Sequence, residues 1–385
     1  MDAEPDSFAP PLATRLLILQ PTPFCNIRCR YCYLPDRDDR SRMSVATVRR
    51  VAERLLEAGL VQQELVVVWH AGEPLAVPPA FYEQAFATLA EVLGAHTRLT
   101  HCIQTNAMLI DDAWCALFEA HGVKVGVSLD GPAALHDRHR VGRRGGGTHA
   151  QVMRGVARLQ RRGIPFHVIA VVTADTLPQA EAFANFFAEL APSELGLNFD
   201  EAEGEHPASS LEGREAAHAD FLRALLPWVR SGRLHVRELA QAHTLVTRPL
   251  PRYRWAGVEW PDNAQVLPYA LLNVAHDGAF GTFSPELLGQ PSAAHGNFLL
   301  GNVHDTPLRD ALRTPAFAKL WREIRDGVAR CRDRCAHFAW CGGGSPVNKL
   351  YETGSMAADE TLYCRSMVKR PFELVLAELE RQLQK

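Results

Sequence analysis

Three cysteines lie close together near the start of the chain. They are Cys25, Cys29 and Cys32, spaced C-x3-C-x2-C, with Tyr31 directly before the last. A hydrophobic core uses cysteine singly, whereas three soft thiolates suit three corners of an iron–sulfur cube. The fourth iron of such a cube has no protein ligand and stays open to another molecule. Zinc and disulfides are weaker alternatives, because zinc sites usually pair cysteines as C-x2-C and three neighbouring cysteines cannot pair.

A second group of four cysteines lies near the end of the chain. The four are Cys331, Cys335, Cys341 and Cys364, spaced C-x3-C-x5-C-x22-C. Three glycines, 342–344, follow the third cysteine and allow the backbone to approach a bulky group closely. Four cysteines predict a closed metal site. Their spacing alone fits a structural zinc ion and a fully ligated 4Fe–4S cluster equally well.

Alternating strand and helix patterns follow the first cysteine group. Apolar runs predict strands at 14–21, 65–69, 98–107, 123–129, 165–173 and 194–199. Helical patterns separate them, at about 44–59, 79–93, 111–121, from 148, and 177–189, with Ser44 and Thr148 as predicted caps. Such alternation predicts an α/β fold with a parallel sheet covered by helices.

The pattern is looser after the sixth strand. We expect a helix at 214–231, a short hairpin and loop at 278–289, a strand at 295–303 and a helix at 307–325.

Polar residues follow four of the predicted strands, where parallel sheets place their chemistry. These groups span 70–74, 104–106, 128–131 and 198–203. Because the strands end at one edge, we expect the four groups to share one rim. His136 and His139, in the charged run after the fourth strand, are expected on a solvated helix face. Arg143 and the glycines that follow Arg144 predict a flexible connector.

Composition and charge limit the possible partners. The chain has 385 residues, 47% hydrophobic and 22% charged, enough for one large domain or two to three ordinary ones. A net charge of -3 argues against a broad nucleic-acid-binding face, and no apolar run approaches the ~18 residues of a membrane span. The acidic N-terminus, MDAEPDSFAP, has no signal-peptide features, so we expect a cytoplasmic protein with reduced thiols.

The isolated Cys102 and Cys115 are expected to be buried packing residues.

The first cysteine group resembles the signature of the radical SAM superfamily. In that family the open iron binds S-adenosylmethionine (SAM), and an electron from the cluster splits it to give a 5′-deoxyadenosyl radical. The resemblance implies a partial (β/α)6 TIM-type barrel. The HAGEP turn is similar to the family's GGEP motif, with Ala71 where glycine is usual, and SLDGP is similar to its serine motif. The implied cofactor-binding residues are Tyr31, Gly72, Glu73, Asn106, Ser128 and Asp130, although Asp130 alone also fits a turn former.

The second cysteine group resembles the SPASM extension of radical SAM peptide maturases. The usual SPASM pattern has cysteines for two auxiliary clusters, but DGAFGTFSPE has none here and CGGGSP carries Ser345. The resemblance therefore implies two 4Fe–4S clusters in total, one open and one closed. It also divides the chain into a barrel (1–235), a bridging region (236–330) and a C-terminal SPASM-like iron–sulfur domain (331–385).

Several stretches together, including QPTPFCNIRCRYCYLPDR and TFSPELLG, resemble the cyclophane-forming branch of these maturases, which is associated with glycine-rich repeat precursors. The resemblance implies hydrogen abstraction from a side-chain β-carbon of a precursor peptide, followed by C–C bonding to an aromatic ring. An electron then passes to a cluster and a proton to a base. The available carboxylates are Asp200, Glu201, Glu203, Asp277 and Glu286, of which Glu201 and Asp277 are the predicted catalytic bases.

The implied partners are the precursor peptide and a reducing donor of flavodoxin or ferredoxin type, with no nucleic acid and no membrane. About two dozen residues precede Cys25, too few for a leader-recognition domain. We therefore expect the barrel, the C-terminal domain or a separate protein to bind the peptide, with pairing to an exposed strand edge near 278–284 as one mode. The alternatives are a formylglycine-forming sulfatase maturase and a non-catalytic iron–sulfur scaffold, although a scaffold needs no SAM-binding turns.

Overall fold

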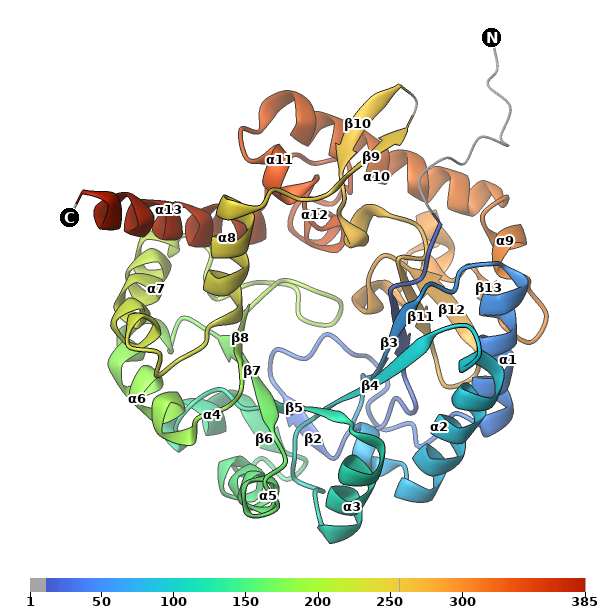
Figure 1. Ribbon diagram of the computed structural model, residues 1–385, viewed down its shortest axis with the longest axis horizontal. Helices are drawn as coiled ribbons and strands as arrows, with labels where there is room; N and C mark the ends of the chain where they lie inside the picture. The colour runs from blue at the N-terminus through green and yellow to red at the C-terminus, as the bar shows by residue number, and fades with distance from the viewer. Residues whose placement is uncertain (1–11, 256, 385) are drawn as a thin grey trace.

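The computed structural model describes residues 12–255 and 257–384. The acidic segment on which the predicted location rests, 1–10, lies outside these residues. Within the described ranges, nine strands form one sheet in the order β13-β12-β11-β1-β3-β4-β5-β7-β8. Figure 1 shows this sheet as a curved layer, with most of the helices on its outer side.

The predicted parallel strands form the central part of this sheet in chain order. They are β1 (Leu16–Leu19), β3 (Glu64–Trp69), β4 (Arg98–Thr105), β5 (Lys124–Ser128), β7 (Phe166–Val172) and β8 (Leu195–Phe199). Most of their side chains are buried, because helices cover the outer face of the sheet. The predicted α/β partial barrel is therefore confirmed.

The predicted covering helices are also present. They are α1 (Val45–Glu57), α2 (Pro79–Leu93), α3 (Asp112–His121), α5 (His149–Arg161), α6 (Ala180–Leu190) and α7 (Glu215–Arg230). Ser44 caps α1 as predicted, because its hydroxyl accepts from the Thr47 amide at 3.0 Å. Thr148 occupies the N-cap position of α5, but its side chain makes no capping bond. Cys115 is fully buried in α3 as expected, whereas Cys102 in β4 is only half-buried.

The bridging region extends the sheet. Strand β11 (Leu271–Val274) pairs in parallel with β1, and β12 (Ala279–Thr282) and β13 (Gly301–Asn302) follow antiparallel. The predicted strand at 295–303 is largely wrong, since 293–298 form a 3-10 turn. The expected exposed edge near 278–284 is also wrong, because β12 lies between β11 and β13. The three-part domain division stays a prediction.

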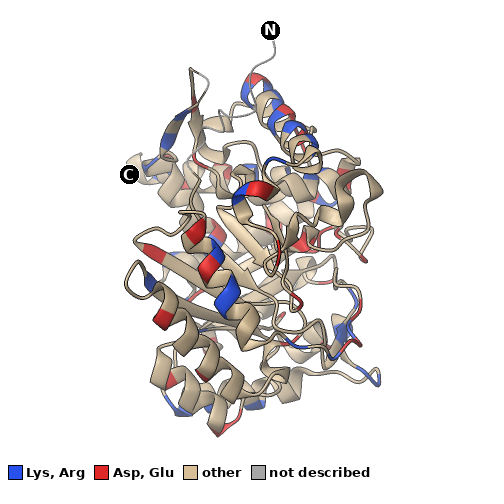
Figure 2. Cartoon of the chain, turned by 90° about the vertical axis from the view of Figure 1, so that its right-hand side faces the viewer, with Lys and Arg blue, Asp and Glu red and all other residues tan. Residues whose placement is uncertain are grey.

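Helices and a hairpin complete the chain on one side of the barrel. These elements are α8 (Arg237–Thr247), β9 (Arg252–Trp255), β10 (Val258–Pro261), α9 (Leu308–Ala311), α10 (Pro315–Arg334), α11 (Phe338–Cys341), α12 (Pro346–Thr353) and α13 (Arg370–Leu383). No helix of the described residues is long and apolar enough to cross a membrane. Figure 2 shows acidic and basic residues interspersed over the side in view.

Candidate functional site

A cavity of about 780 Å³ lies inside the curve of the sheet. All three cysteines of the first group line it, together with polar residues from the ends of β3, β4, β5 and β8. Those predicted from the sequence include Tyr31, Gly72, Glu73, Asn106, Ser128, Asp200, Glu201, Glu203 and Glu286. The expectation of one shared rim is therefore confirmed.

The first cysteine loop is attached to the segment that follows β5. Strand β2 (Ile27–Cys29) pairs antiparallel with β6 (Arg140–Gly142), which sets Cys29 opposite Arg140. Arg143 donates from Nη1 to the Cys25 carbonyl at 2.9 Å. The prediction of a flexible connector is thus wrong for Arg143, because its side chain is hydrogen-bonded to the cysteine loop.

The HAGEP turn packs directly against the cysteine loop. Gly72 has φ +57°, and a Cβ there would lie 2.3 Å from the Thr22 carbonyl oxygen, so only glycine fits. The Glu73 amide donates to the Phe24 carbonyl at 2.7 Å. Ala71, in the position where the related family usually has glycine, has φ +68°. A left-handed backbone at this position explains why glycine is favoured there.

Glu73 joins the ends of β3 and β4. Its Oε1 accepts from the Leu75 amide at 2.9 Å and the Thr105 hydroxyl at 2.6 Å, and its Oε2 accepts from the Asn106 amide at 2.9 Å. Burial raises the pKa of Glu73, and these three bonds oppose that shift. The Asn106 side chain donates to Asn26 Oδ1 at 2.6 Å, which ties the turn after β4 to the cysteine loop.

Tyr31, Asp130 and Arg140 form a buried group beneath the first cysteines. The Tyr31 hydroxyl donates to Asp130 Oδ2 at 2.5 Å, and Arg140 Nε lies 3.0 Å from Asp130 Oδ1. Arg140 Nη1 is also 3.9 Å from Cys29 Sγ. The sequence interpretation missed Arg140, although it stands in the charged run that was singled out. Asp130 lies behind the cavity wall, where it holds Tyr31 and Arg140.

The expected solvated face of the histidines is wrong for His136. Its ring is fully buried: Nδ1 accepts from the Asp130 amide at 3.3 Å and Nε2 lies 3.0 Å from the Thr148 hydroxyl. Burial lowers the pKa of His136 to about 4, so the ring is neutral at pH 7. His139 is half-buried, with Nε2 3.2 Å from Asp175 Oδ2.

A group of carboxylates lines another part of the cavity. Glu201 and Glu203 follow β8, and Glu286 stands in the 3-10 turn Pro285–Leu287. Burial raises the pKa of Glu201 to about 7, while hydrogen bonds with Asn348 and Glu203 oppose the shift. Burial, followed by the charges of Glu201 and Glu286, also raises the pKa of Glu203. These close carboxyl groups therefore resist being ionised together.

Of the other two predicted carboxylates, Asp200 also lines the cavity but is held by hydrogen bonds, and Asp277 does not line it. Asp200 accepts from the Ser210 amide at 2.8 Å and lies 2.8 Å from His206 Nε2. Asp277 lies outside the cavity, exposed in the turn between β11 and β12, where it accepts from the Ala279 amide at 3.0 Å. Of the two predicted bases, Glu201 is the one that the structure brings to the cavity.

The second cysteine group comes together in one small pocket beside the cavity. Cys331 lies in the last turn of α10, Cys335 ends that helix, Cys341 ends α11 and Cys364 begins the π-turn Cys364–Lys369. Gly343 has φ +106°, and a Cβ there would lie 2.8 Å from Val328. The glycines therefore allow the loop to pack closely around the four thiols.

The thiols of both cysteine groups are suitable ligands for the positively charged core of an iron–sulfur cluster. Burial raises the pKa of Cys29 to about 11 and of Cys364 to about 12, so bare thiolates are costly at both sites. Metal ions offset that cost by binding the deprotonated sulfur. Within the described residues, no three His, Cys, Asp or Glu side chains gather as the ligands of one metal ion. In a cubane each cysteine ligates a separate iron.

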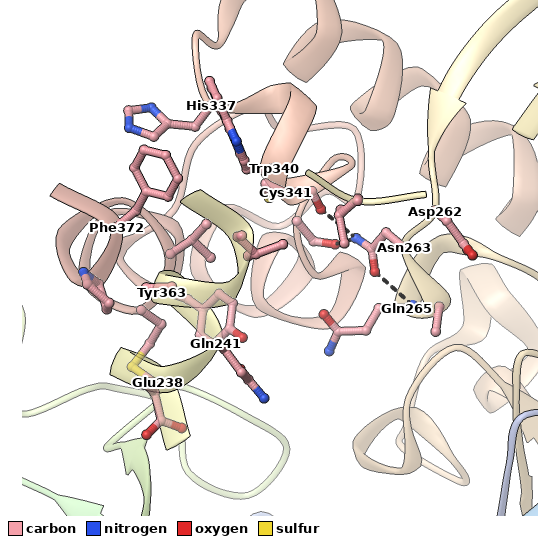
Figure 3. A pocket seen from close by; sticks show the side chains of 18 residues that line it. Glu238, Gln241, Asp262, Asn263, Gln265, His337, Trp340, Cys341, Tyr363 and Phe372 are labelled. Carbon is pink, nitrogen blue, oxygen red and sulfur yellow. Dashed lines mark hydrogen bonds between the residues drawn. The ribbon is translucent and has the colours of Figure 1, made fainter. Parts of the chain in front are cut away.

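A side groove of about 320 Å³ adjoins the cavity between α8, α13 and the loop at 262–265. Figure 3 shows Trp340 and Phe372 on one side and the amides of Gln241 and Gln265 nearer its middle. The two openings share wall residues, namely Glu238, Gln241, Gln265, Tyr363 and Met367. The groove thus lies directly beside the cavity.

Comparison with known sequences gives a family match. Residues 19–187 match the family model of the radical SAM superfamily. An uncharacterised protein of Synechocystis sp. is 36% identical over 391 residues, which cover 99% of this chain and 95% of that protein. The serine-type anaerobic sulfatase-maturating enzyme of Klebsiella aerogenes is 36% identical over 182 residues, which cover 47% of this chain and 44% of the enzyme.

Solved structures share the fold. The enzyme anSMEcpe, bound to AdoMet and the Cp18Cys peptide, superposes with a TM-score of 0.75 at 19% identity and covers 96% of this chain and 98% of its own. Streptococcus suis SuiB, bound to its precursor peptide SuiA, has a TM-score of 0.58 at 16% identity and covers 92% of this chain and 76% of its own.

Proposed function

The chain belongs to the radical SAM superfamily, and from that membership we propose that it modifies a ribosomally made precursor peptide. The proposed reaction removes a hydrogen atom from a side-chain β-carbon and joins that carbon to a Phe, Tyr, Trp or His ring of the same peptide. A single observation supports the proposal most strongly. One cavity is lined by both the three-cysteine loop and Glu201, and the pocket of the second cysteine group adjoins it at Ser345.

The wall that carries the three-cysteine loop supports SAM binding. Cys25, Cys29 and Cys32 would hold three irons of a 4Fe–4S cluster, which with SAM supplies a 5′-deoxyadenosyl radical. Gly72, Asn106 and Ser128 line the same wall and present backbone and side-chain polar groups to the cofactor. We propose SAM contacts at these residues. Tyr31, Glu73 and Asp130 contribute through the bonds that fix the loop and the turns.

The carboxylate-bearing wall of the cavity supports the removal of a proton. After the carbon radical adds to the ring, the adduct must lose one proton and one electron to regain its aromatic character. Glu201 is the proposed base, because a group with a pKa near 7 is ready to accept a proton at neutral pH. The second cysteine group lies next to that wall, and a closed cluster there would accept the electron.

Two positions separate this chain from the usual two-cluster SPASM pattern. Glu286 and Ser345 stand where that pattern has cysteines, and both line the cavity. The cavity wall is therefore built from oxygen-bearing side chains where a further cluster would have cysteine ligands. This difference favours cross-linking over formylglycine formation, because the usual sulfatase maturases keep both auxiliary clusters.

A sulfatase-maturing reaction is the second candidate, and a specific observation supports it. The Klebsiella aerogenes sulfatase-maturating enzyme matches this chain at 36% identity, although over less than half of either protein. Both reactions begin at a β-carbon and end with the loss of a proton and an electron, so the cavity suits either.

The side groove suits a polypeptide that extends beyond the cavity. Its apolar side accepts side chains, and neither the Gln241 nor the Gln265 side-chain amide has a hydrogen-bond partner among the described residues. Such amides can bond a peptide backbone. We also propose a flavodoxin- or ferredoxin-type reductant and a cytoplasmic setting, in which the cysteines stay reduced.

The first test is anaerobic. Reconstituted protein with SAM and dithionite should release 5′-deoxyadenosine, and about eight irons should fall to about four in a Cys25→Ala, Cys29→Ala, Cys32→Ala variant. Absence of 5′-deoxyadenosine would favour the scaffold alternative. About four irons with one zinc in the wild type would assign Cys331–Cys364 to zinc and contradict the proposed electron acceptor.

The second test identifies the product. Short aromatic peptides encoded beside the gene are co-expressed with the protein and analysed by mass spectrometry. A cross-link removes two hydrogens, blocks fragmentation between the joined residues and gives no reaction with a hydrazide. A hydrazide-reactive aldehyde at Ser or Cys would support formylglycine formation instead.

A further inference from the structure

Helix α12 contacts both chemical sites through consecutive residues. Asn348 donates from Nδ2 to Glu201 Oε2 in the cavity, and Lys349 donates from Nζ to Cys331 Sγ at 3.3 Å. The Asn348 and Lys349 side chains are buried, at 2% and 4% exposure. Neighbouring residues of one helix thus contact the proposed base and a cysteine of the second group.

The burial of Lys349 needs an anion. Burying an ammonium without a partner costs several kcal/mol. Among the described residues, Cys331 Sγ is the one hydrogen-bond acceptor of Nζ, and the Asp359 carboxylate is close enough to interact by charge. A neutral thiol is a weak acceptor, whereas a metal-bound thiolate carries negative charge. The lysine is therefore best explained by an anionic metal–sulfur group at Cys331.

The surrounding packing holds the lysine in this position. A Cβ on Gly327 of α10 would lie 3.1 Å from Lys349 Nζ, and one on Gly344 would lie 3.8 Å from its Cε. A methyl group on Gly327 would crowd the ammonium, whereas the distance at Gly344 is an ordinary contact, and Lys349 itself is only 4% exposed. The ammonium is consequently a fixed charge rather than a mobile surface group.

We propose that Lys349 is a positioning residue that raises the reduction potential of the cluster held by the second cysteine group. Charge and hydrogen bonds at the sulfurs set the potential of such clusters, and a fixed cation stabilises the form with the extra electron. The inference rests on the proposed function, in which the ring adduct loses its proton to Glu201 and its electron to this oxidised cluster. Helix α12 then holds both acceptors, with Asn348 on the carboxylate and Lys349 on the thiolate.

The test is a redox titration followed by EPR. The full-length, reconstituted Cys25→Ala, Cys29→Ala, Cys32→Ala variant isolates the signal of the second cluster. Adding Lys349→Met should shift its potential to more negative values, so that the reduced-to-oxidised ratio at a fixed potential falls about tenfold, or ~59 mV for one electron. Lys349→Gln, which keeps a donor but loses the charge, should shift it in the same direction by a smaller amount.

Lys369 provides the matched control. It interacts by charge with Cys364 and Cys335 but is partly exposed and paired with Glu360. Solvent screens its charge, so Lys369→Met should change the ratio by less than about twofold. An unchanged potential in Lys349→Met, or an equal shift in Lys369→Met, overturns the inference.

Iron content separates the remaining outcomes. If both Lys349 variants lose the irons that Lys369→Met retains, with unchanged melting temperatures, the ammonium holds the cluster in place instead of setting its potential, and the inference is overturned. If the triple cysteine variant itself holds no iron, the proposed second cluster fails and the inference fails with it. If the Lys349→Met variant keeps its iron and its potential is unchanged, only the role of Lys349 is contradicted and the proposed second cluster stands.

Discussion

Arg140 and Asp130 form a buried ion pair directly beneath the cysteine loop, with Nε 3.0 Å from Oδ1. Arg140 faces Cys29 across the β2–β6 pairing, and Asp130 accepts from the Tyr31 hydroxyl. Asp130 also accepts from the Val171 amide of β7 at 2.9 Å. The pair therefore links the loop that carries the cysteines to the centre of the sheet.

Breaking this pair should destabilise the metal-free protein strongly. Arg140→Met leaves the Asp130 charge buried and unpaired, which costs about 3–5 kcal/mol of the free energy of unfolding. Chemical denaturation of the apo protein measures the change. Arg138→Met is the matched control from the same charged run, because the Arg138–Asp175 pair is exposed and contributes about 0–1 kcal/mol. Equal losses in the two variants would contradict the structural role assigned to Arg140.

Gly72→Ala should prevent SAM from binding beside the first cluster. The added Cβ would lie 2.3 Å from the Thr22 carbonyl oxygen and 2.7 Å from that of Phe24, so the turn must separate from the cysteine loop. The SAM-induced change in the EPR signal should disappear. Gly122→Ala is the control: its φ is +60° but nothing lies within 4 Å, so it costs only about 1–2 kcal/mol of backbone strain. A retained SAM response in Gly72→Ala would contradict the proposed placement of the cofactor.

The sequence predicted those features whose cause is local. The parallel strands are continuous apolar runs, and Ser44 is followed by a helical pattern, so neighbouring residues decide both. His136 was placed wrongly because α4 (Ala133–His139) is too short for periodicity to identify its buried face. Its burial depends on Thr148, which lies beyond a loop.

Contacts between distant segments could not be predicted. Strand β11 is a four-residue run, and only its pairing with β1 distinguishes it from an ordinary hairpin strand. Glu201 and Asp277 both follow strands, and only the arrangement of the sheet sets one in the cavity and the other outside it. The contact of Lys349 with Cys331 likewise joins two helices whose order in sequence gives no distance between them.

Filling the side groove should weaken peptide binding. Leu245 of α8 is half-buried on the groove wall, and Leu245→Trp would occupy the space proposed for substrate side chains. Loss of one buried apolar contact costs about 1–2 kcal/mol, so KM for the peptide modified in the co-expression test should rise about tenfold. His243→Trp, on an exposed position of the same helix, should leave KM unchanged. An unchanged KM in Leu245→Trp would show that the peptide does not bind in the groove.

From the raised pKa values of the cavity carboxylates, we expect opposite effects of pH on the free energy of unfolding and on activity. Burial raises the pKa of Glu201 to about 7, and it raises those of Glu203 and Glu286 as well. Between the ordinary glutamate value of about 4.5 and pH 7 the folded state then binds more protons than the unfolded state, so stability falls as the pH rises. Glu201→Gln should flatten this slope in denaturation of the apo protein, because glutamine does not titrate.

Product formation should respond in the other direction. A base with a pKa near 7 is deprotonated only above that pH, so the rate of cross-linking should rise through about pH 7 and then level off. Glu201→Gln should still release 5′-deoxyadenosine but form less than about a hundredth of the product, in line with the 10²–10⁴-fold contribution of general bases. Asp277→Asn is the control, since Asp277 lies outside the cavity and its substitution should leave the pH profile unchanged. If Asp277→Asn alters the pH profile and Glu201→Gln does not, Asp277 is the base. The turn between β11 and β12 would then have to approach the substrate in the complex.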